Sequence, residues 1–426
     1  MSRRASHSAA GRHGMTLVEM LVATAATLIL MGAIAQVFSV FGSAVTNSRS
    51  MIELDARMRT VAWRLRSDLA GATARPLPPL DPTAGEGYLE IIEGPLNDNN
   101  APTGTTTLAA DTDDVILFTT RSSDPPFLGK ASSAMIESPT AEVAWFLQAT
   151  AGTNPQTYTL FRRQMLVMGY VGSGTFAASG NNTAIFTAWN TFYDAYDVSV
   201  RREGTTLIPN TLSDLTRRES RFMHNPNGIT NGTGFPYAFS PVTGVFFDSA
   251  ASSPRVGEDV VLTNVIGFDV RVFDSAAPVA VSGNDAVVPG DPGLAAAGSA
   301  VANGCYVDLG NGVTAAGPSG VASHFGGTAQ GNSRGQAIGL SGSTTWDTWS
   351  THYESNGVDE DGVAGADQGT NGLDDDNDGF VDEPDEQETS PPYPYPLRGI
   401  EIRIRCYEPS SRQVRQTTIR HTFVPH

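Results

Sequence analysis

Lysine and cysteine are nearly absent from this chain. Its 426 residues include one lysine, Lys130, and two cysteines, Cys305 and Cys406. Two cysteines are too few for a cysteine zinc cluster or a disulfide-dense scaffold. Basic residues are also scarce, 27 against 45 acidic ones, which gives a formal charge of −18. Nucleic acid is therefore not expected as a partner, because phosphate binding needs a basic face.

Catalytic sequence motifs are missing as well. The chain contains no H-E-x-x-H, C-x-x-C or G-x-S-x-G pattern, and its only lysine does not stand in a phosphate-binding loop. The histidines are scattered, which favours surface or hydrogen-bonded roles over metal ligation. We therefore expect no enzymatic activity, and a surface-anchored hydrolase is the weakest alternative.

A long apolar run stands near the N-terminus. It extends from Leu17 to Phe41, with Glu19 as its only charge, and follows a basic stretch that contains Arg3, Arg4 and Arg12. Twenty-five helical residues reach ~37 Å, which is enough to cross a hydrocarbon core of ~30 Å. By the positive-inside rule the basic flank stays in the cytoplasm and the rest lies outside it. The run is too long for a secretory signal peptide, and no clear small-residue cleavage site follows it.

The stretch Gly14-Met15-Thr16-Leu17-Val18-Glu19-Met20-Leu21-Val22-Ala23 resembles the cleavage and methylation segment of type IV pilins and pseudopilins. The resemblance implies that a prepilin peptidase cuts after Gly14 and that Met15 is then N-methylated. It also implies that Glu19 pairs with a terminal amine during assembly, since a buried carboxylate and ammonium are tolerable only together. His13 departs from the commoner lysine or arginine. The alternative is a plain membrane anchor in which Glu19 is incidental.

The helix should continue beyond the membrane. Apolar residues recur at helical spacing on one face, while arginines take most other positions; the stripe is Leu54, Met58, Val61, Leu65 and Leu69. Gly71 and Pro76 are stop signals. These features predict one helix of ~85 Å from about Met15 to about Gly71, and the stripe itself needs no explanation beyond core packing.

The rest of the chain reads as short strands between turns. Apolar or alternating runs occur at residues 115–118, 143–147, 158–163 and 265–273, and a hairpin is expected from residue 398 to about Phe423. Together they predict an α+β fold, in which a long membrane-spanning helix packs by its C-terminal half on an antiparallel sheet with long loop insertions. Residues 212–221 could form a short helix whose basic face is solvated. Cys305 and Cys406 could pair outside the membrane; the favoured alternative is a buried free thiol at Cys406.

This order of elements resembles minor pseudopilin J of type II secretion and the W-type minor pilins of type IV pili. The resemblance is carried by weak motifs: Leu65-Arg66-Ser67-Asp68-Leu69, Leu160-Phe161-Arg162-Arg163, Val265-Ile266-Gly267-Phe268 and the C-terminal hairpin. It implies a single-pass protein of the bacterial inner membrane with a periplasmic domain. The implied partners are the prepilin peptidase, other pseudopilins or minor pilins, and the inner-membrane secretion platform.

An acidic segment precedes the hairpin. Residues 354–388 hold 14 acidic residues and neither lysine nor arginine. Within it the spacing fits a calcium loop, because calcium takes six to eight hard oxygens that such a loop wraps around one ion. The expected ligands, at positions 1, 3, 5, 7, 9 and 12, are Asp374, Asp376, Asp378, the Phe380 carbonyl, Asp382 and Asp385. The related stretch fifteen residues earlier, with Asp359 and Asp361, predicts a weaker second site. The alternative is a solvated acidic loop.

The sequence thus predicts a structural subunit with calcium as its cofactor. The expected organisation is a leader at 1–14, a helix at 15–75 (transmembrane about 17–41, amphipathic about 50–71), a β-rich domain at 76–274, a Gly/Ala/Ser-rich insertion at 275–345, the acidic segment at 346–397 and the hairpin at 398–426. The expected role is a minor pseudopilin in the tip complex of a secretion pseudopilus. The alternatives are a minor pilin and a membrane-tethered, calcium-dependent adhesin or binding module.

Overall fold

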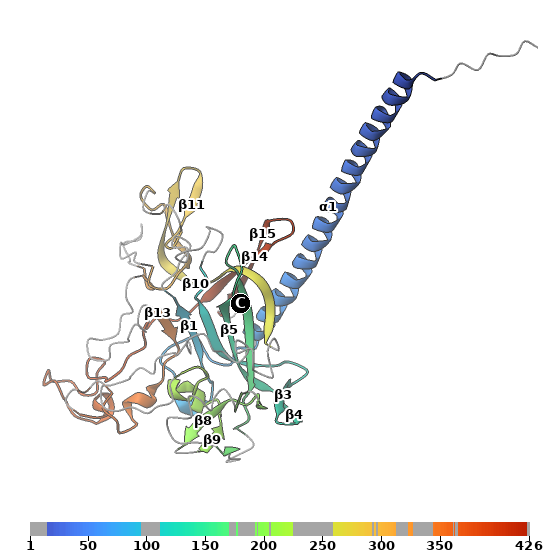
Figure 1. The fold of residues 1–426 in the computed structure, drawn as a ribbon. Coiled ribbons are helices and arrows are strands. Elements are labelled where there is room, and N and C mark those ends of the chain that lie inside the picture. The colour runs from blue at the N-terminus through green and yellow to red at the C-terminus, as the bar shows by residue number, and fades with distance from the viewer. Residues whose placement is uncertain are drawn as a thin grey trace, which may run out of the picture. The chain divides into compact units, whose positions relative to one another are not determined.

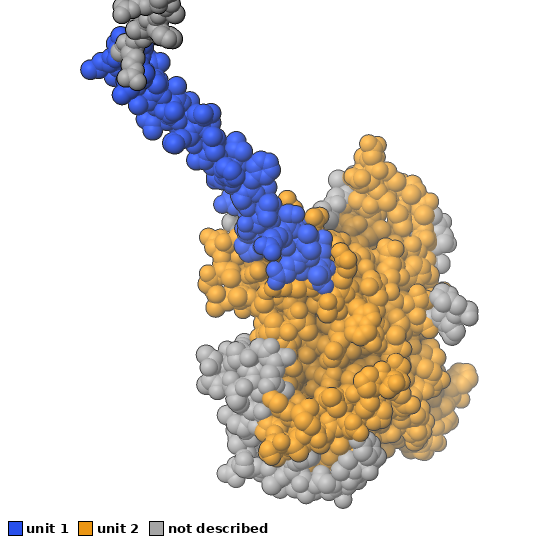
Figure 2. Space-filling model, turned by 90° about the vertical axis from the view of Figure 1, so that its right-hand side faces the viewer, with its two compact units in different colours: residues 1–56, 408–412 blue, residues 57–407, 413–426 orange. Residues whose placement is uncertain are grey.

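The protein is described by a computed structural model. It covers residues 15–94, 111–169, 176–177, 192–193, 195–203, 206–224, 259–291, 294, 297–311, 323–326, 344–360, 362 and 365–423. The expected leader with Gly14, and Asp361 of the weaker calcium site, lie outside these residues. The chain forms two compact units, residues 1–56 with 408–412 and residues 57–407 with 413–426 (Figure 2).

One continuous helix, α1, extends from Leu17 to Ala70 (Figure 1). This confirms the prediction of a single long N-terminal helix. Its first half is an exposed apolar surface, on which Leu17 is 81% and Ile29 75% exposed. The helix is therefore long and apolar enough to span a membrane.

The last part of α1 belongs to the globular unit and packs as an amphipathic helix. Met58, Val61, Leu65 and Leu69 are buried, as their spacing predicts, and the arginines between them are exposed. The helix ends at Ala70, and at the next residue, Gly71, an added Cβ would lie 2.2 Å from the carbonyl oxygen of Arg121. A glycine is therefore needed at this stop for the chain to pass so close to a strand.

A large antiparallel sheet forms the body of this unit. Its strands follow the order β13-β1-β2-β5-β6-β10-β14-β15, and β11 and β12 also pair with β10 (Figure 1). The bounds are β1 Leu89–Glu93, β2 Val115–Arg121, β5 Thr140–Ala149, β6 Tyr158–Leu166, β10 Val260–Ser282, β11 Asp285–Val287, β12 Ala302–Val307, β13 Thr344–Asp347, β14 Gly399–Glu408 and β15 Gln413–Thr422. The α+β fold class expected from the sequence is confirmed.

Shorter elements complete the described chain. There are two smaller sheets in the described residues. One pairs β3 with β4, and the other has the strand order β7-β9-β8. Their bounds are β3 Phe127–Ala131, β4 Ala134–Ser138, β7 Phe176–Ala177, β8 Val200–Glu203 and β9 Thr206–Pro209. Single-turn 3-10 helices are η1 Pro82–Ala84, η3 Asp214–Thr216, η4 Arg218–Ser220, η6 Thr351–Glu354 and η7 Gln368–Thr370.

The sheet buries the apolar faces that alternation predicts. Ile400, Ile402 and Ile404 of β14 are fully buried, and so is Cys406, whose thiol lies 3.2 Å from the carbonyl oxygen of Asn264. Among the described residues, neither Cys406 nor Cys305 forms a disulfide. Strand β10 is longer than the sequence suggests, because it continues to Ser282, through the expected start of the Gly/Ala/Ser-rich insertion. The continuation is possible because β11 and β12 supply backbone partners for its second half.

The expectation of a solvated basic face at residues 212–221 is wrong. Arg218 and Arg221 are buried and form ion pairs with Glu90 of β1, at 2.5 and 2.8 Å, and with Asp347 of β13, at 3.2 and 2.8 Å. The segment also forms two separate turns, η3 and η4, in place of one helix. Two buried carboxylates, Glu90 and Asp347, neutralise these arginines and allow them to be buried. Both partners lie far away in the sequence, so the residue spacing within 212–221 does not predict the burial.

Candidate functional site

Glu19 lies in the first turn of α1 and interacts with Thr16, the residue before the helix. The Glu19 carboxylate accepts hydrogen bonds from the backbone N–H of Thr16, at 2.8 Å, and from its hydroxyl, at 3.1 Å. The Thr16 hydroxyl accepts in turn from the N–H of Glu19, at 3.2 Å. This reciprocal pair is a capping box, which satisfies helix-end donors that would otherwise be unpaired. In the single chain Glu19 therefore has a local structural role.

The acidic segment is built from two copies of one fifteen-residue loop. In the first copy the N–H of Gly357 donates to Asp367, at 3.0 Å; in the second the N–H of Gly372 donates to Asp382, at 2.9 Å. Gly357 and Gly372 have φ values of 78° and 79°, and Asp367 and Asp382 have φ values of 58° and 55°. The repeat seen in the sequence is thus also a repeat of backbone conformation.

An asparagine begins each copy in the same way. Asn356 accepts from the N–H of Val358 and donates to Glu360, at 2.8 and 2.7 Å. Asn371 accepts from the N–H of Leu373 and donates to Asp375, both at 2.7 Å. Such Asx turns are local, so the sequence of each copy specifies them directly.

The second copy brings three of the predicted ligands together. Asp374, Asp376 and Asp378 each place one carboxylate oxygen within 4.8 Å of the other two. The loop is held by backbone N–H groups: Asp374 accepts from Asp378 and Gly379, at 3.1 and 3.0 Å, and Asp376 accepts from Asp378, at 3.0 Å. Positive φ values at Asn377 and Gly379 make the sharp turn.

Two further carboxylates lie beside this group and are absent from the sequence-based ligand set. Asp376, Glu383 and Glu386 also have ligand atoms within 4.8 Å of one another. Glu386 is buried and accepts from the N–H groups of Asp375, Asp376 and Asp382, the last at 2.7 Å. Both carboxylate oxygens of Glu383 are buried and have no hydrogen-bond partner in the described part of the chain. In the sequence, Glu383 and Glu386 could have been recognised as further candidate ligands because several acidic residues follow Asp378 closely.

Two other predicted ligands, Asp382 and Asp385, belong to neither group of close carboxylates. Both are exposed, and Asp382 accepts from the N–H of Gly372. The Phe380 carbonyl stays a predicted ligand. In the first copy Asp359 accepts from the N–H of Gly362, at 2.5 Å. Its place in a second calcium site remains a prediction, because Asp361 is outside the described residues.

The acidic segment also contains three buried carboxylates, Glu354, Glu360 and Glu388. Glu354 accepts from the N–H groups of Glu388 and Thr389, at 2.9 and 2.8 Å. Burial, together with a hydrogen bond to Glu388, raises the pKa of Glu360 to about 9, so Glu360 keeps its proton at neutral pH. A protonated Glu360 beside Glu388 lowers the repulsion that two carboxylates would otherwise have.

The chemistry of the two regions differs. The start of α1 offers a single carboxylate on an apolar surface, whereas the acidic repeat offers clustered oxygen donors of the kind that calcium prefers.

No family model, no curated protein and no solved structure matches this chain.

Proposed function

We propose that the chain is a minor pseudopilin, a structural subunit of the tip complex of a type II secretion pseudopilus, most similar to subfamily J. One observation carries the proposal: the segment that resembles a prepilin processing site leads directly into α1, whose exposed apolar surface has Glu19 as its only charge before Phe41. The α+β fold, a long helix followed by an antiparallel sheet, supports it.

The physical basis of assembly is charge pairing in an apolar medium. A carboxylate within a membrane helix is costly and persists when a cationic partner neutralises it. The amine created at Met15 by cleavage in a neighbouring subunit would be such a partner. The basic leader would stay in the cytoplasm, which would put the globular unit in the periplasm.

N-terminal sequencing of membrane-extracted protein tests the proposal. The mature chain should begin at Met15 with a methylated amine, and a Gly14→Phe variant should stay unprocessed, because a bulky side chain would block the cleavage position. An intact Met1 in the wild-type protein, or a cut after Ala35, would contradict the assignment to this family.

We also propose that the second copy of the repeat binds calcium. The donor set fits, since Asp374, Asp376 and Asp378 converge and Glu383 adds two buried oxygens without a partner. Residues 354–388 contain no lysine or arginine that could neutralise these carboxylates, and bound calcium would do so. It would thereby hold the loop against the sheet domain.

A second candidate function is a calcium-dependent binding module on a membrane tether. It is favoured by three apolar side chains exposed on the same loop: Leu373 at 61%, Phe380 at 68% and Val381 at 53%. A tether does not need Glu19, whereas assembly into a pseudopilus or a type IV pilus does. The effect of Glu19 variants on association with other pseudopilins therefore separates the two functions.

A further inference from the structure

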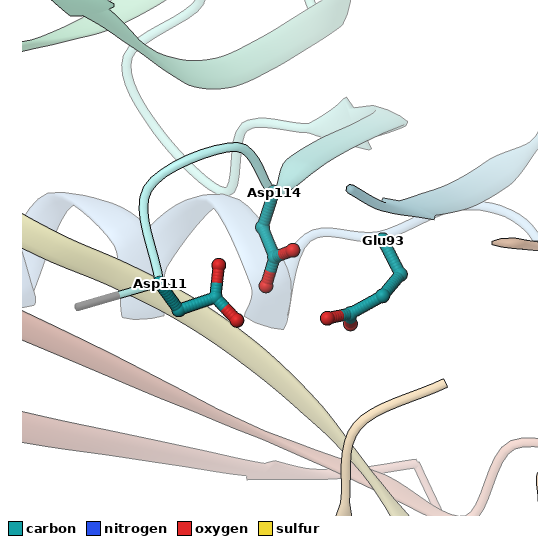
Figure 3. Close-up of side chains that lie close together, drawn as sticks. All are labelled: Glu93, Asp111 and Asp114. Atoms are coloured by element: carbon teal, nitrogen blue, oxygen red, sulfur yellow. The ribbon is translucent and has the colours of Figure 1, made fainter. Parts of the chain in front are cut away.

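Three buried carboxylates meet inside the sheet domain, far in the sequence from the acidic repeat. Glu93, Asp111 and Asp114 each place a carboxylate oxygen within 4.8 Å of the other two. They are 4%, 1% and 1% exposed. Figure 3 shows the three side chains turned toward one common space.

The sheet fixes the positions of these residues. Glu93 is the last residue of β1 and Asp114 precedes β2, and the antiparallel pairing of Ile92 with Val115 sets the two acids side by side. Strand β10 holds the third member, because the N–H of Phe268 donates to the carbonyl oxygen of Asp111, at 2.9 Å. The backbone positions of the three acids are therefore set by β1, β2 and β10.

Hydrogen bonds satisfy only part of this cluster. Asp114 accepts from the N–H groups of Val270, at 2.6 Å, and Gly94, at 3.5 Å. Both carboxylate oxygens of Asp111 and one of Glu93 are buried and have no hydrogen-bond partner among the residues that the structure describes. Buried polar atoms are nearly always paired, so these three oxygens require an explanation.

The nearby arginine does not neutralise the cluster. Arg271 forms ion pairs with three other carboxylates, Asp269 at 3.1 Å, Asp308 at 2.9 Å and Asp291 at 2.9 Å. Glu93, Asp111 and Asp114 have no ion pair with any residue in the described part of the chain. Asp269 and Asp308 instead add negative potential, which contributes to raising the pKa of both Glu93 and Asp114.

Protonation alone does not account for the geometry. A protonated carboxyl is a donor and needs an acceptor, yet neither oxygen of Asp111 is hydrogen-bonded. A cation at the centre would instead contact an oxygen of each side chain.

We propose that Glu93, Asp111 and Asp114 form a second, buried site for one hard divalent cation of the calcium class. The donors are all carboxylate oxygens, which calcium, magnesium and manganese prefer. Zinc and copper are suited by imidazole and thiolate ligands, which this cluster does not offer. Two oxygens that contact the same calcium ion, at about 2.4 Å each, lie at most about 4.8 Å apart, and the oxygens of the three side chains are within this limit. The ion would tie β1, β2 and β10 together at one point.

Metal content of the full chain in detergent tests this site. After treatment with chelator and addition of calcium, the wild-type protein should retain one ion more per chain than Asp111→Asn. An Asp376→Asn variant should lose the ion of the acidic repeat and keep this one, and the double variant should lose both. Asp113→Asn, which changes an adjacent acid outside the cluster, should bind as the wild type does.

Thermal melting gives a readout that separates binding from folding. In chelator, Asp111→Asn should melt no lower than the wild type, because the amide has nearly the same size and carries no charge. In calcium, both proteins should gain the stability that the repeat supplies, and the wild type should gain more. Glu93→Gln is the second variant if Asp111→Asn does not fold. Equal calcium content in the wild type and the variant, or equal loss in Asp113→Asn, would overturn the proposal.

Discussion

Asp68, near the end of α1, accepts two hydrogen bonds from the guanidinium of Arg162 on β6, from Nε at 2.7 Å and from Nη2 at 2.8 Å. Both side chains are almost fully buried, at 3% and 5% exposure. The indole N–H of Trp145 on β5 donates to the same carboxylate, at 3.1 Å. This bidentate contact joins the helix to two strands of the sheet.

Removing the charge of Asp68 should destabilise the globular unit strongly. Asp68→Asn leaves a buried arginine without its counterion, so we expect a loss of about 3–5 kcal/mol in the free energy of unfolding. Urea unfolding followed by tryptophan fluorescence measures it. In the Asp68→Asn/Arg162→Met double variant the loss should be much smaller than the sum of the two single losses. Additive losses would show that the pair does not act as a unit.

Glu90 should matter far more for stability than an exposed acid with a similar partner. It pairs with Arg218 and Arg221 in the interior, whereas Glu86 pairs with Arg75, which is 65% exposed. We expect Glu90→Gln to cost about 3–5 kcal/mol and the matched Glu86→Gln to cost about 0–1 kcal/mol. Similar losses in the two variants would contradict this difference in burial.

The contribution of Glu90 should also depend on pH. Burial opposes ionisation, but Arg218, His224 and Arg221 hold the pKa of Glu90 well below its ordinary value of 4.5. A lowered pKa in the folded state stabilises the protein fully above the unfolded pKa, and this stabilisation is lost as pH falls toward the folded pKa. The gap in unfolding free energy between wild type and Glu90→Gln should therefore shrink below about pH 4.5. A gap that is constant down to pH 3 would exclude this linkage.

Variants at Glu19 can separate its capping role from its charge. Glu19→Gln preserves the capping box and removes the charge, whereas Thr16→Ala removes the cap and preserves the charge. If the charge drives assembly, Glu19→Gln and Glu19→Ala should both remain in the membrane but fail to co-purify with partner pseudopilins. Thr16→Ala should still co-purify. Loss of partners in Thr16→Ala alone would assign Glu19 to capping.

Calcium should stabilise the wild-type protein through the acidic repeat. A ligand at a hundredfold excess over its dissociation constant stabilises the folded state by about 2.7 kcal/mol, so chelation should lower the melting temperature by about 5 °C. Residues 354–392 should loosen first, and magnesium should substitute poorly because it prefers a smaller octahedral shell. Asp376→Ala should lose the part of this response that comes from the repeat and keep any part that comes from Asp111.

Two further variants distinguish ligand sets for the repeat. The sequence spacing places Asp385 at the last position of the loop, whereas the structure places Glu386 beside Asp376. If the structural group holds the ion, Asp385→Asn should keep the chelator response and Glu386→Gln should lose it. The opposite result would restore the sequence-based set.

Local features of this protein could be predicted from the sequence. The apolar run and the periodic leucines define α1, alternation defines β14, and the aspartate spacing defines the cluster at Asp374, Asp376 and Asp378. Each depends on contacts between residues a few positions apart. The acids directly after Ile92 and before Val115 were also visible, but nothing in their own spacing shows that the two strands pair.

The sequence by itself therefore determined the long helix, the strands β2, β5, β6 and β10, the hairpin of β14 and β15, and the turn chemistry of the acidic loop. Backbone periodicity and Asx turns are encoded over short distances. The tertiary structure alone decided the burial of Arg218 and Arg221, the contact of Asp68 with Arg162, and the meeting of Glu93 with Asp111 and Asp114. Those contacts depend on strand order and register, which bring together residues from distant segments and exclude water from their charges.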